Sequence, residues 1–254
     1  MEGSINTHSP LISIITITFN AEKELPATLK SIEAQSFEDY ENIIIDGASK
    51  DKTLEIVNNF ATHRTKIVSE PDNGLYDAMN KGLKLAKGKY IIFLNAGDSF
   101  HSDKILEKYA QACYKDYDII YGDTDIVDSD RQRKGPRHLS VPEKLTVKSF
   151  SKGMLVCHQA FMVKKELAPL YDLSYRFSAD YDWTIKCIRN SAPENNHNLR
   201  TITIDYLSDG LTDKNMKASL RERFRIMCKV YGIPRTLLNH LLFLFRALRR
   251  KLSR

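Results

Sequence analysis

The chain has 254 residues, of which 42% are hydrophobic and 28% charged, and its formal net charge is +6. This length and composition suit one α/β domain with a C-terminal extension, and the lack of repeats or biased tracts excludes a low-complexity protein. The cysteines (Cys113, Cys157, Cys187 and Cys228) form no CxxC pair, which argues against a zinc or dithiol centre and favours a reducing, cytosolic setting. The N-terminal stretch MEGSINTHSP is polar, so we expect no signal peptide.

The charge is distributed unevenly along the chain. Residues 214–254 contain 12 lysines and arginines against one glutamate, a net charge of +11, and the rest of the chain has a net charge of −5. A basic segment of this kind suits an anionic partner, either nucleic acid or an anionic membrane surface.

In the first hundred residues, apolar runs alternate with amphipathic ones. We expect strands at 12–18, 42–45, 66–69 and 90–94, and helices at 24–35, from 53 onward and from 74 to 86. The strand segments are continuous and rich in β-branched residues, ISIITIT at 12–18 above all, which is typical of strands buried on both faces. The alternation predicts an α/β fold with a mostly parallel central sheet flanked by helices.

The second half of the chain is less regular. We expect a helix at 103–114, a strand at 118–121, a hairpin from 125–127 and 133–137, a strand over 155–163, a helix at 180–190 and a strand at 200–206. The strand over 155–163 (LVCHQAFMV) is interrupted by His158 and Gln159. Segments 214–231 and 234–252 have the pattern of two basic amphipathic helices.

Polar residues follow the apolar strands of the first half. Thr18 and Asn20 lie at the end of the first strand, Asp46 ends the second, and Asp98 follows the fourth. Because ligands of α/β sheets bind beyond the carboxyl ends of parallel strands, these residues are candidates for one site. The chain has neither GxGxxG nor GxxxxGK[ST], so a diphosphate needs another partner, and a divalent cation on Asp98 supplies one. The alternative is that Asn95 to Asp98 is merely a turn.

Other candidates also have plain alternatives. Asp46 either contacts a nucleoside or begins an Asx-type turn. Asp180 and Asp182 open a helix, where one of them is a candidate general base or both simply stabilise the helix N-terminus. His158 is a ligand or substrate contact, or else a core histidine.

Five segments of the chain match the motifs of one enzyme family. They are SIITITFNA (13–21), QSFEDYENIIIDGASKDKT (35–53), SEPDNGLYDAMNKGLKLAKGKYIIFLNAGD (69–98), CHQAFMV (157–163) and YRFSADYDW (175–183). With these segments the chain resembles the family 2 glycosyltransferases, which have the GT-A fold. It is most similar to bacterial enzymes that build O-antigen, capsule and other surface polysaccharides.

The resemblance implies a domain layout and a role for individual residues. A Rossmann-like GT-A domain would cover residues 11–212, with a nucleotide-sugar half at about 11–122 and an acceptor half at about 123–212. An N-terminal tail (1–10) would precede it and C-terminal amphipathic helices (213–254) would follow it. The donor would contact Thr18, Phe19, Asp46, Asp72, Tyr76, Asn80 and Asn95. Asp98 would hold Mg²⁺ or Mn²⁺, Asp180 would be the catalytic base, and His158, Gln159 and Asp182 would border the sugar and the acceptor.

The chain departs from the family pattern at two places. Many relatives have several acids where this chain has Asn95 and Gly97, and fewer charged ligands generally bind a cation more weakly. The later motif commonly has Glu-Asp, whereas here Ala179 precedes Asp180. Asp182 therefore stays a competing candidate for the base.

The resemblance also implies a reaction. A sugar would pass with inversion from a nucleoside-diphosphate sugar, a UDP-sugar in the first place, to a hydroxyl of a polyprenyl-diphosphate-linked saccharide. Asp180 would take the proton of the attacking hydroxyl, and the cation on Asp98 would neutralise the departing diphosphate.

The C-terminal stretch LLNHLLFLFRAL (237–248) is apolar but too short to span a bilayer. Its apolar stripe and basic flanks predict a helix lying on an anionic membrane surface. We therefore expect a cytoplasmic protein held peripherally at the inner face of the cytoplasmic membrane. The alternative is that the stripe packs on the domain or on a second subunit in a homodimer.

Two rival functions have weaker support. A sugar-phosphate nucleotidyltransferase would need a glycine-rich basic loop after the first strand, and TFNAEKE (18–24) has no glycine. A nucleic-acid-binding protein is the other rival, because of the basic tail. No recognised motif supports it, and aromatic residues do not interleave with the charges of that tail, so we expect no nucleic-acid partner.

Overall fold

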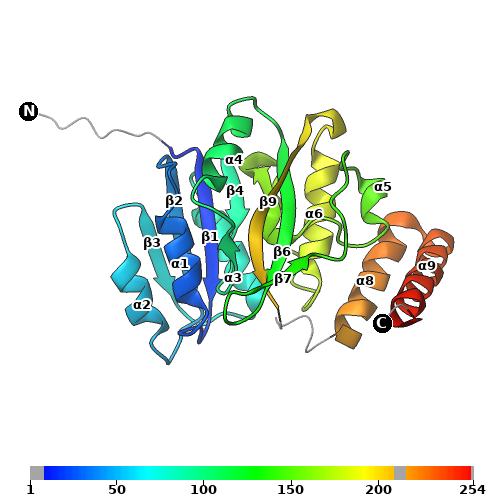
Figure 1. Cartoon of the computed structure of the whole chain (residues 1–254), viewed down its shortest axis with the longest axis horizontal. Coiled ribbons are helices and arrows are strands. Elements are labelled where there is room, and N and C mark those ends of the chain that lie inside the picture. The colour runs from blue at the N-terminus through cyan, green and yellow to red at the C-terminus, as the bar shows by residue number, and fades with distance from the viewer. Residues whose placement is uncertain (1–8, 209–215, 253–254) are drawn as a thin grey trace, which may run out of the picture.

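The computed structural model describes residues 9–208 and 216–252. A nine-stranded sheet crosses the molecule in the order β3-β2-β1-β4-β8-β6-β9-β5, and β7 pairs with β6 outside this path. Figure 1 shows helices on both sides of this sheet, with α8 and α9 lying together at the end of the molecule far from β3. The expected α/β architecture is confirmed, including the C-terminal helices.

The first half of the sheet is parallel. It consists of β1 (Ile12–Thr18), β2 (Tyr40–Asp46), β3 (Thr65–Ser69) and β4 (Tyr90–Phe93). β1 lies between β2 and β4, and the register brings Thr18 beside Asp46 at the carboxyl ends of the strands. All seven residues of β1 are buried, as expected for a parallel strand that is covered on both faces.

Alternate residues of β1 serve two different cores. Ile15 and Ile17 pack with α3 (Leu75–Leu85), whereas Ile12 and Ile14 pack with α4 (Ile105–Cys113). The helices α1 (Leu25–Glu33) and α2 (Thr53–Phe60) form a third, smaller cluster with Ile44 of β2. Gly82 lets α3 lie directly on β1, because a Cβ atom there would come within 2.4 Å of Ile15 Cγ2.

The second half of the sheet is mixed. Its strands are β5 (Ser99–Phe100), β6 (Ile119–Val127), β7 (Arg133–Pro136), β8 (Phe161–Lys164) and β9 (Asn196–Leu207). β8 runs antiparallel to both β4 and β6, β7 is antiparallel to β6, and β9 is parallel to β6 and antiparallel to β5. The remaining helices are α5 (Val147–Phe150), α6 (Ala179–Asn190), α8 (Met216–Tyr231) and α9 (Ile233–Leu252).

Two sequence-based expectations are corrected in this half. The strand expected over 155–163 begins only at Phe161, because His158–Ala160 form a 3₁₀ turn in which polar residues leave the extended conformation. The strands expected separately at 118–121 and 125–127 are one strand, β6, which is continuous because its paired neighbours accommodate a register shift near Gly122.

The two C-terminal helices are packed differently. Ile226 and Met227 of α8 are buried in the same apolar cluster as residues of α6, so α8 is part of the folded core. α9 instead presents Ile233, Leu237, Leu238, Leu241, Leu242 and Phe245, all 48–69% exposed. Across the described part of the chain, no helix has the length and apolarity required to cross a membrane.

Candidate active site

The turns after β1 and β2 are joined through the carboxylate of Asp46. This fully buried group accepts hydrogen bonds from the Ser49 amide (3.0 Å) and the Ser69 hydroxyl (2.7 Å), and also from the Ser49 hydroxyl. Ser49 Oγ in turn accepts from the amide of Asn20, 2.8 Å away, at the end of β1. Asp46 thus organises this corner of the sheet, and its local bond reaches the Ser49 amide three residues further on.

Phe19 and Asp72 meet above this corner, at Gly47. A Cβ atom on Gly47 would lie 3.0 Å from Asp72 Oδ2 and 3.2 Å from Phe19 Cδ2, so both side chains lie close to this backbone position. Phe19 is 63% exposed, which is unusual for a large apolar side chain. Asp72 forms an ion pair of 2.6 Å with Lys81 of α3. The hydroxyl of Thr18 is buried and has no hydrogen-bond partner among the described residues.

Asp98 lies in the loop between β4 and β5, where Gly97 has the left-handed φ of 102° that the turn requires. Its carboxylate accepts a hydrogen bond of 3.0 Å from the amide of Leu207 at the end of β9. Burial raises the pKa of Asp98 to about 7, while the bond from Leu207 and the charge of Arg131 oppose this rise. A carboxylate in this state gains from a cation placed beside it.

Asp180 is the second residue of α6. One of its carboxylate oxygens accepts a hydrogen bond of 3.2 Å from the phenol of Tyr76 on α3, and the same oxygen accepts from the amide of Tyr181 at 2.9 Å. The helix N-terminus and the phenol thus hold this carboxylate from two sides.

His158 stands in a cage of aromatic rings made by Phe93, Tyr171 and Trp183. Its Nε2 lies 2.7 Å from the hydroxyl of Tyr171, and its Nδ1 is buried without a partner among the described residues. Burial lowers the pKa of His158 to about 4, against the charge of Asp180, which raises it. The imidazole is therefore neutral near pH 7.

Asn80 supports the wall of this cage. Its side-chain amide donates to the carbonyl of Tyr171 (3.1 Å) and accepts from the amide of the same residue (2.7 Å). Gln159 is buried next to His158, and its side-chain oxygen lies 3.1 Å from the thiol of Cys157. The structure therefore places Asn80 and Gln159 behind the cage, where they fix neighbouring groups.

The 3₁₀ turn at His158–Ala160 lies between the elements that carry the two aspartates. The ring of His158 packs against Phe93 of β4, the strand that precedes Asp98, and against Trp183 of α6, the helix that contains Asp180. The structure thus brings the strand before Asp98 and the helix of Asp180 to the same turn. The corner of Asp46 lies at the carboxyl end of β2, two strands away from β4.

Comparisons with known proteins identify the family of the chain. The family model described as Glycosyl transferase family 2 matches residues 13–168, which is more than half of the chain. The chain belongs to glycosyl transferase family 2. A PGL/p-HBAD biosynthesis glycosyltransferase of Mycobacterium bovis is 36% identical over 192 residues, covering 72% of both chains. An uncharacterized glycosyltransferase of Methanocaldococcus jannaschii is 30% identical over 198 residues, covering 71% of this chain and 66% of its own.

Solved structures share the fold of this glycosyltransferase. S. aureus TarS 1-349 in complex with UDP-GlcNAc matches with a TM-score of 0.72 at 19% identity, over 86% of this chain and 65% of that one. The mannosyltransferase PcManGT from Pyrobaculum calidifontis, in complex with GDP-Man and Mn²⁺, matches with a TM-score of 0.57 at 14% identity, over 92% and 74% of the two chains. The glycosyltransferase thus spans about two thirds of the TarS fragment.

Asp182, the competing candidate for the base, is placed differently from Asp180. It is buried and forms an ion pair of 2.6 Å with Lys186, one turn further along α6. Its carboxylate is thus engaged by a side chain of its own helix. Of these two acids, Asp180 accepts a hydrogen bond from the phenol of Tyr76, whereas Asp182 pairs with Lys186.

The structure also reveals groups that sequence reasoning did not select. His101, Asp125 and Asp205 bring potential ligand atoms within 4.8 Å of one another beside β5, although Arg133 already pairs with Asp125. Arg131 reaches back from the β6–β7 turn to the Gly97 carbonyl (2.6 Å) and the Ser99 hydroxyl (2.7 Å), on either side of Asp98. No local pattern signals either group, because the partners are distant in sequence.

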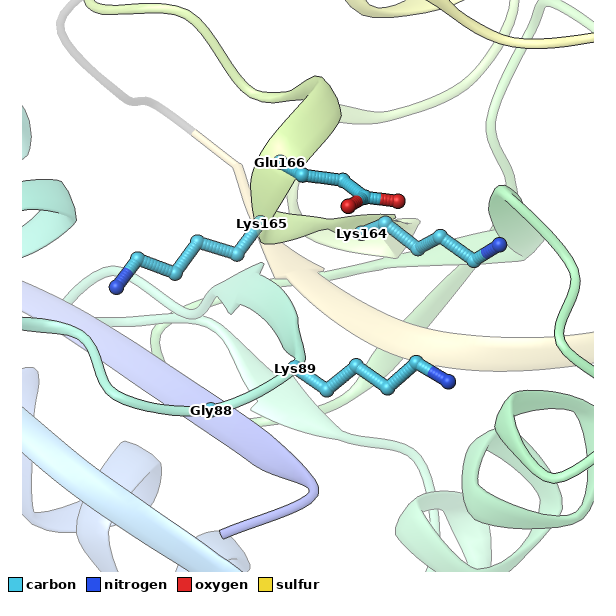
Figure 2. Close-up of a pocket in the computed structure, with 5 residues that line it drawn as sticks. All are labelled: Gly88, Lys89, Lys164, Lys165 and Glu166. Carbon is cyan, nitrogen blue, oxygen red and sulfur yellow. The ribbon is translucent and has the colours of Figure 1, made fainter. Parts of the chain in front are cut away.

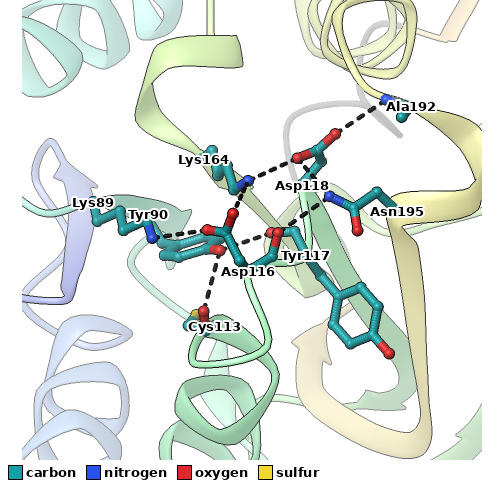
Figure 3. Close-up of polar contacts among 9 residues, drawn as sticks. All are labelled: Lys89, Tyr90, Cys113, Asp116, Tyr117, Asp118, Lys164, Ala192 and Asn195. Atoms are coloured by element: carbon teal, nitrogen blue, oxygen red, sulfur yellow. Dashed lines mark hydrogen bonds and ion pairs between the residues drawn. The ribbon is translucent and has the colours of Figure 1, made fainter.

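A pocket at the opposite ends of the parallel strands, where β4 begins, is a poor candidate for the active site. Gly88, Lys89, Lys164, Lys165 and Glu166 line it, at the start of β4 and the end of β8 (Figure 2). Lys164 pairs with Asp118 (2.9 Å) and Asp116 (3.1 Å), and Lys89 pairs with Asp116 (2.8 Å) (Figure 3). These lysines are already neutralised by carboxylates, so they serve to join the strand ends.

Proposed function

We propose that this chain transfers a sugar, with inversion, from a nucleoside-diphosphate sugar to the hydroxyl of a saccharide acceptor. The observation that carries the proposal is the packing of His158 between Phe93 of β4, the strand that precedes Asp98, and Trp183 of α6, the helix that contains Asp180, within a family 2 fold. The two acids have different environments, since Asp98 is buried with a raised pKa and Asp180 is bonded to a phenol. A cation beside Asp98 would offset the cost of burying its charge, whereas Asp180 is held in a fixed orientation, as a general base must be.

The donor would bind along the corner made by the ends of β1 and β2. Exposed Phe19 offers a ring for a nucleobase, and the buried hydroxyl of Thr18 beside it has no partner in the part of the chain that the structure describes. Asp46 and Asp72 border the same corner and supply acceptors for ribose or base hydrogens. TarS in complex with UDP-GlcNAc supports a UDP-sugar as the first candidate donor.

Mg²⁺ or Mn²⁺ would be held by Asp98, with Asn95 as a second oxygen ligand. The fit is supported by a buried Asn95 Oδ1 that has no partner among the described residues, three positions before a buried carboxylate. Oxygen donors of this kind suit both cations, and the cation supplies charge neutralisation of the diphosphate when it is bound. The relative PcManGT was solved with Mn²⁺.

Asp180 would accept the proton of the acceptor hydroxyl. Its bonds to Tyr76 and to the amide of Tyr181 hold the carboxylate in one orientation, which is what a general base needs. Neutral His158 and the rings around it would form the dry wall beside the sugar.

The acceptor, we propose, is a saccharide linked to polyprenyl diphosphate at the inner face of the cytoplasmic membrane, in cell-surface polysaccharide synthesis such as that of O-antigen or capsule. The exposed apolar face of α9 supports this, because its leucines belong to a segment with a net charge of +11. Apolar side chains together with basic ones are the usual requirement for binding an anionic bilayer surface. A homodimer formed through the same face is the competing use of these leucines.

A panel of nucleotide sugars with Mg²⁺ or Mn²⁺, scored by release of nucleoside diphosphate, tests the proposal. We expect release with one donor, strongly dependent on the cation. Asp180→Asn should abolish transfer and leave UDP binding within about 2-fold, because the base does not touch the nucleotide. A chain that neither binds nor cleaves any nucleotide sugar would rule out the proposed function.

A further inference from the structure

The C-terminal helix α8 holds the segment that leads into the helix of Asp180. Glu222 accepts a hydrogen bond from the amide of Arg176 on one carboxylate oxygen and from the amide of Phe177 on the other, both at 2.8 Å. Two charge-assisted bonds from one carboxylate to adjacent amides fix a backbone more firmly than neutral bonds do. The partners are 46 and 45 residues apart in sequence, so this is a tertiary contact between the tail and the catalytic half.

The residue after this pair is also tied to α8. Ser178 is the N-cap of α6, a position where a serine hydroxyl normally accepts from an amide in the first turn of its own helix. Here its hydroxyl lies instead 2.9 Å from the hydroxyl of Ser219 and 3.1 Å from the carbonyl of Ser219 on α8. Both serines are buried. The start of α6 is therefore fixed from α8, two residues before Asp180.

α8 itself is firmly attached to the domain. Ile226 and Met227 are buried against the cluster that contains Tyr181 and Trp183 of α6. Tyr231, at the end of α8, donates a hydrogen bond of 2.8 Å to the carbonyl of Val147. These anchors make α8 a rigid support, and a displacement of α8 would carry residues 176–178 with it.

We propose that Glu222 is a positioning residue for Asp180, so that α8 sets the orientation of the catalytic base toward Tyr76. The proposal rests on the proposed function in one respect, the role of Asp180 as base. A carboxylate must lie within hydrogen-bond reach of the proton that it takes, and a displacement of about 1 Å can cost on the order of 100-fold in rate. The helical tail is then part of the catalytic apparatus as well as a surface helix.

Hydrogen–deuterium exchange tests the contact without any need for activity. In Glu222→Ala, the amides of Arg176 and Phe177 lose their acceptors, and we expect them to exchange at least about 10-fold faster, with the rest of the domain unchanged. Glu55→Ala is the matched control, since Glu55 is an exposed glutamate on α2. Unchanged exchange in Glu222→Ala would overturn the proposal whatever the enzyme does.

Steady-state kinetics test whether Glu222 affects catalysis by Asp180. We expect Glu222→Ala to lower kcat for sugar transfer about 10-fold or more while the donor KM stays within about 2-fold, because Glu222 is remote from the donor corner. If kcat is unchanged although Asp180→Asn is inactive, Glu222 does not position the base. If Asp180→Asn is itself active, the assignment of the base fails, and the exchange result still decides the contact.

A second variant protects the test against misfolding. Ser219→Ala removes only the hydroxyl that meets Ser178, so it should fold if Glu222→Ala does not. We expect it to show the same pattern to a smaller degree, with faster exchange at the start of α6 and a lower kcat. A fall in thermal stability in which donor KM and kcat change alike would indicate general loosening and would overturn the proposal.

Discussion

The phenol of Tyr76 donates a hydrogen bond of 3.2 Å to the carboxylate of Asp180, across 104 residues of sequence. It joins α3, which follows the corner where we propose that the donor binds, to α6, which lies in the half that we expect to bind the acceptor. Burial, together with the charge of Asp180, raises the pKa of Tyr76 well above its usual range, so the phenol stays protonated and keeps donating. Through this bond, the placement of the proposed base depends on α3, which carries Tyr76.

Removing the Tyr76 hydroxyl tests this dependence. In Tyr76→Phe the ring remains, but Asp180 loses one of its donors, and the protein should lose about 1 kcal/mol of stability. We expect kcat for transfer to fall about 10-fold, because the carboxylate is no longer held in one orientation. Steady-state kinetics and urea denaturation measure the two effects. Tyr114→Phe is the control, since Tyr114 is 68% exposed, and it should change neither quantity.

The cation site makes a second prediction. Asp98→Asn should weaken the Mn²⁺-supported binding of UDP by at least about 10-fold, because a neutral amide is a poorer ligand than a carboxylate. Asp205→Asn is the matched variant from the group of His101, Asp125 and Asp205, and it should leave this binding unchanged. Calorimetric titration of UDP with and without Mn²⁺ compares the two. The reverse result would move the cation from Asp98 to that group.

The framework of this site could be predicted from the sequence, because its signals are local. β1, β2 and β4 are continuous apolar runs, and the residues that end them, Thr18 and Asp46, meet in the register of the sheet. The partners of these residues could not be predicted. Ser69 bonds to Asp46 from 23 residues away, and Arg131 bonds to Gly97 from 34 residues away, contacts that only the tertiary fold creates.

Tertiary contacts also decide the structure of residues 155–163 and of the C-terminal segment, where the hydrophobic pattern of the sequence was not sufficient. The apolar pattern of 155–163 predicted a strand, but His158 and Gln159 are side chains that need polar partners, and these exist only in the folded turn beside Tyr171 and Cys157. The amphipathic tail predicted two helices correctly. Which of the two packs on the domain could not be predicted, because a core-facing stripe and an exposed stripe have the same spacing.

A third prediction concerns Asp46. Two substitutions separate its role in stabilising the fold from its proposed role in binding the donor. Asp46→Ala leaves the amide of Ser49 and the hydroxyl of Ser69 without acceptors in a buried place, which should cost about 2–4 kcal/mol of unfolding free energy. In Asp46→Asn the side-chain oxygen can still accept from both, and the hydroxyl of Ser49 can rotate to accept from the new amide. We therefore expect Asp46→Asn to lose less than half as much stability. Both variants should bind UDP more weakly, as fluorescence titration would measure.

The lowered pKa of buried His158 leads us to expect that the free energy of unfolding depends on pH. Its pKa is about 4 in the folded protein against 6.5 for an ordinary histidine, so between these values the unfolded chain binds a proton that the folded chain does not. The free energy of unfolding is therefore unaffected by His158 above pH 6.5, where the imidazole is neutral in both states. It decreases as the pH falls toward 4, by about 3 kcal/mol in total. Urea denaturation from pH 7 to pH 4.5 should show a smaller loss for His158→Gln than for the wild type. His63→Gln, at an exposed loop, should follow the wild-type curve.

The exposed face of α9 makes the last prediction. Leu238 and Leu241 are 59% and 54% exposed, and replacing both with glutamate adds negative charge to a face that we propose to lie on anionic lipid. The double variant should no longer float with vesicles containing about 30% phosphatidylglycerol, whereas the wild type should float and be released by high salt. Leu170→Glu with Leu173→Glu is the matched control, because these leucines are also 50% and 55% exposed and three residues apart, but lie outside the tail. If the wild type stays at the bottom of the gradient and sediments as a dimer that the α9 variant splits, the face joins two copies of the chain, and the membrane proposal fails.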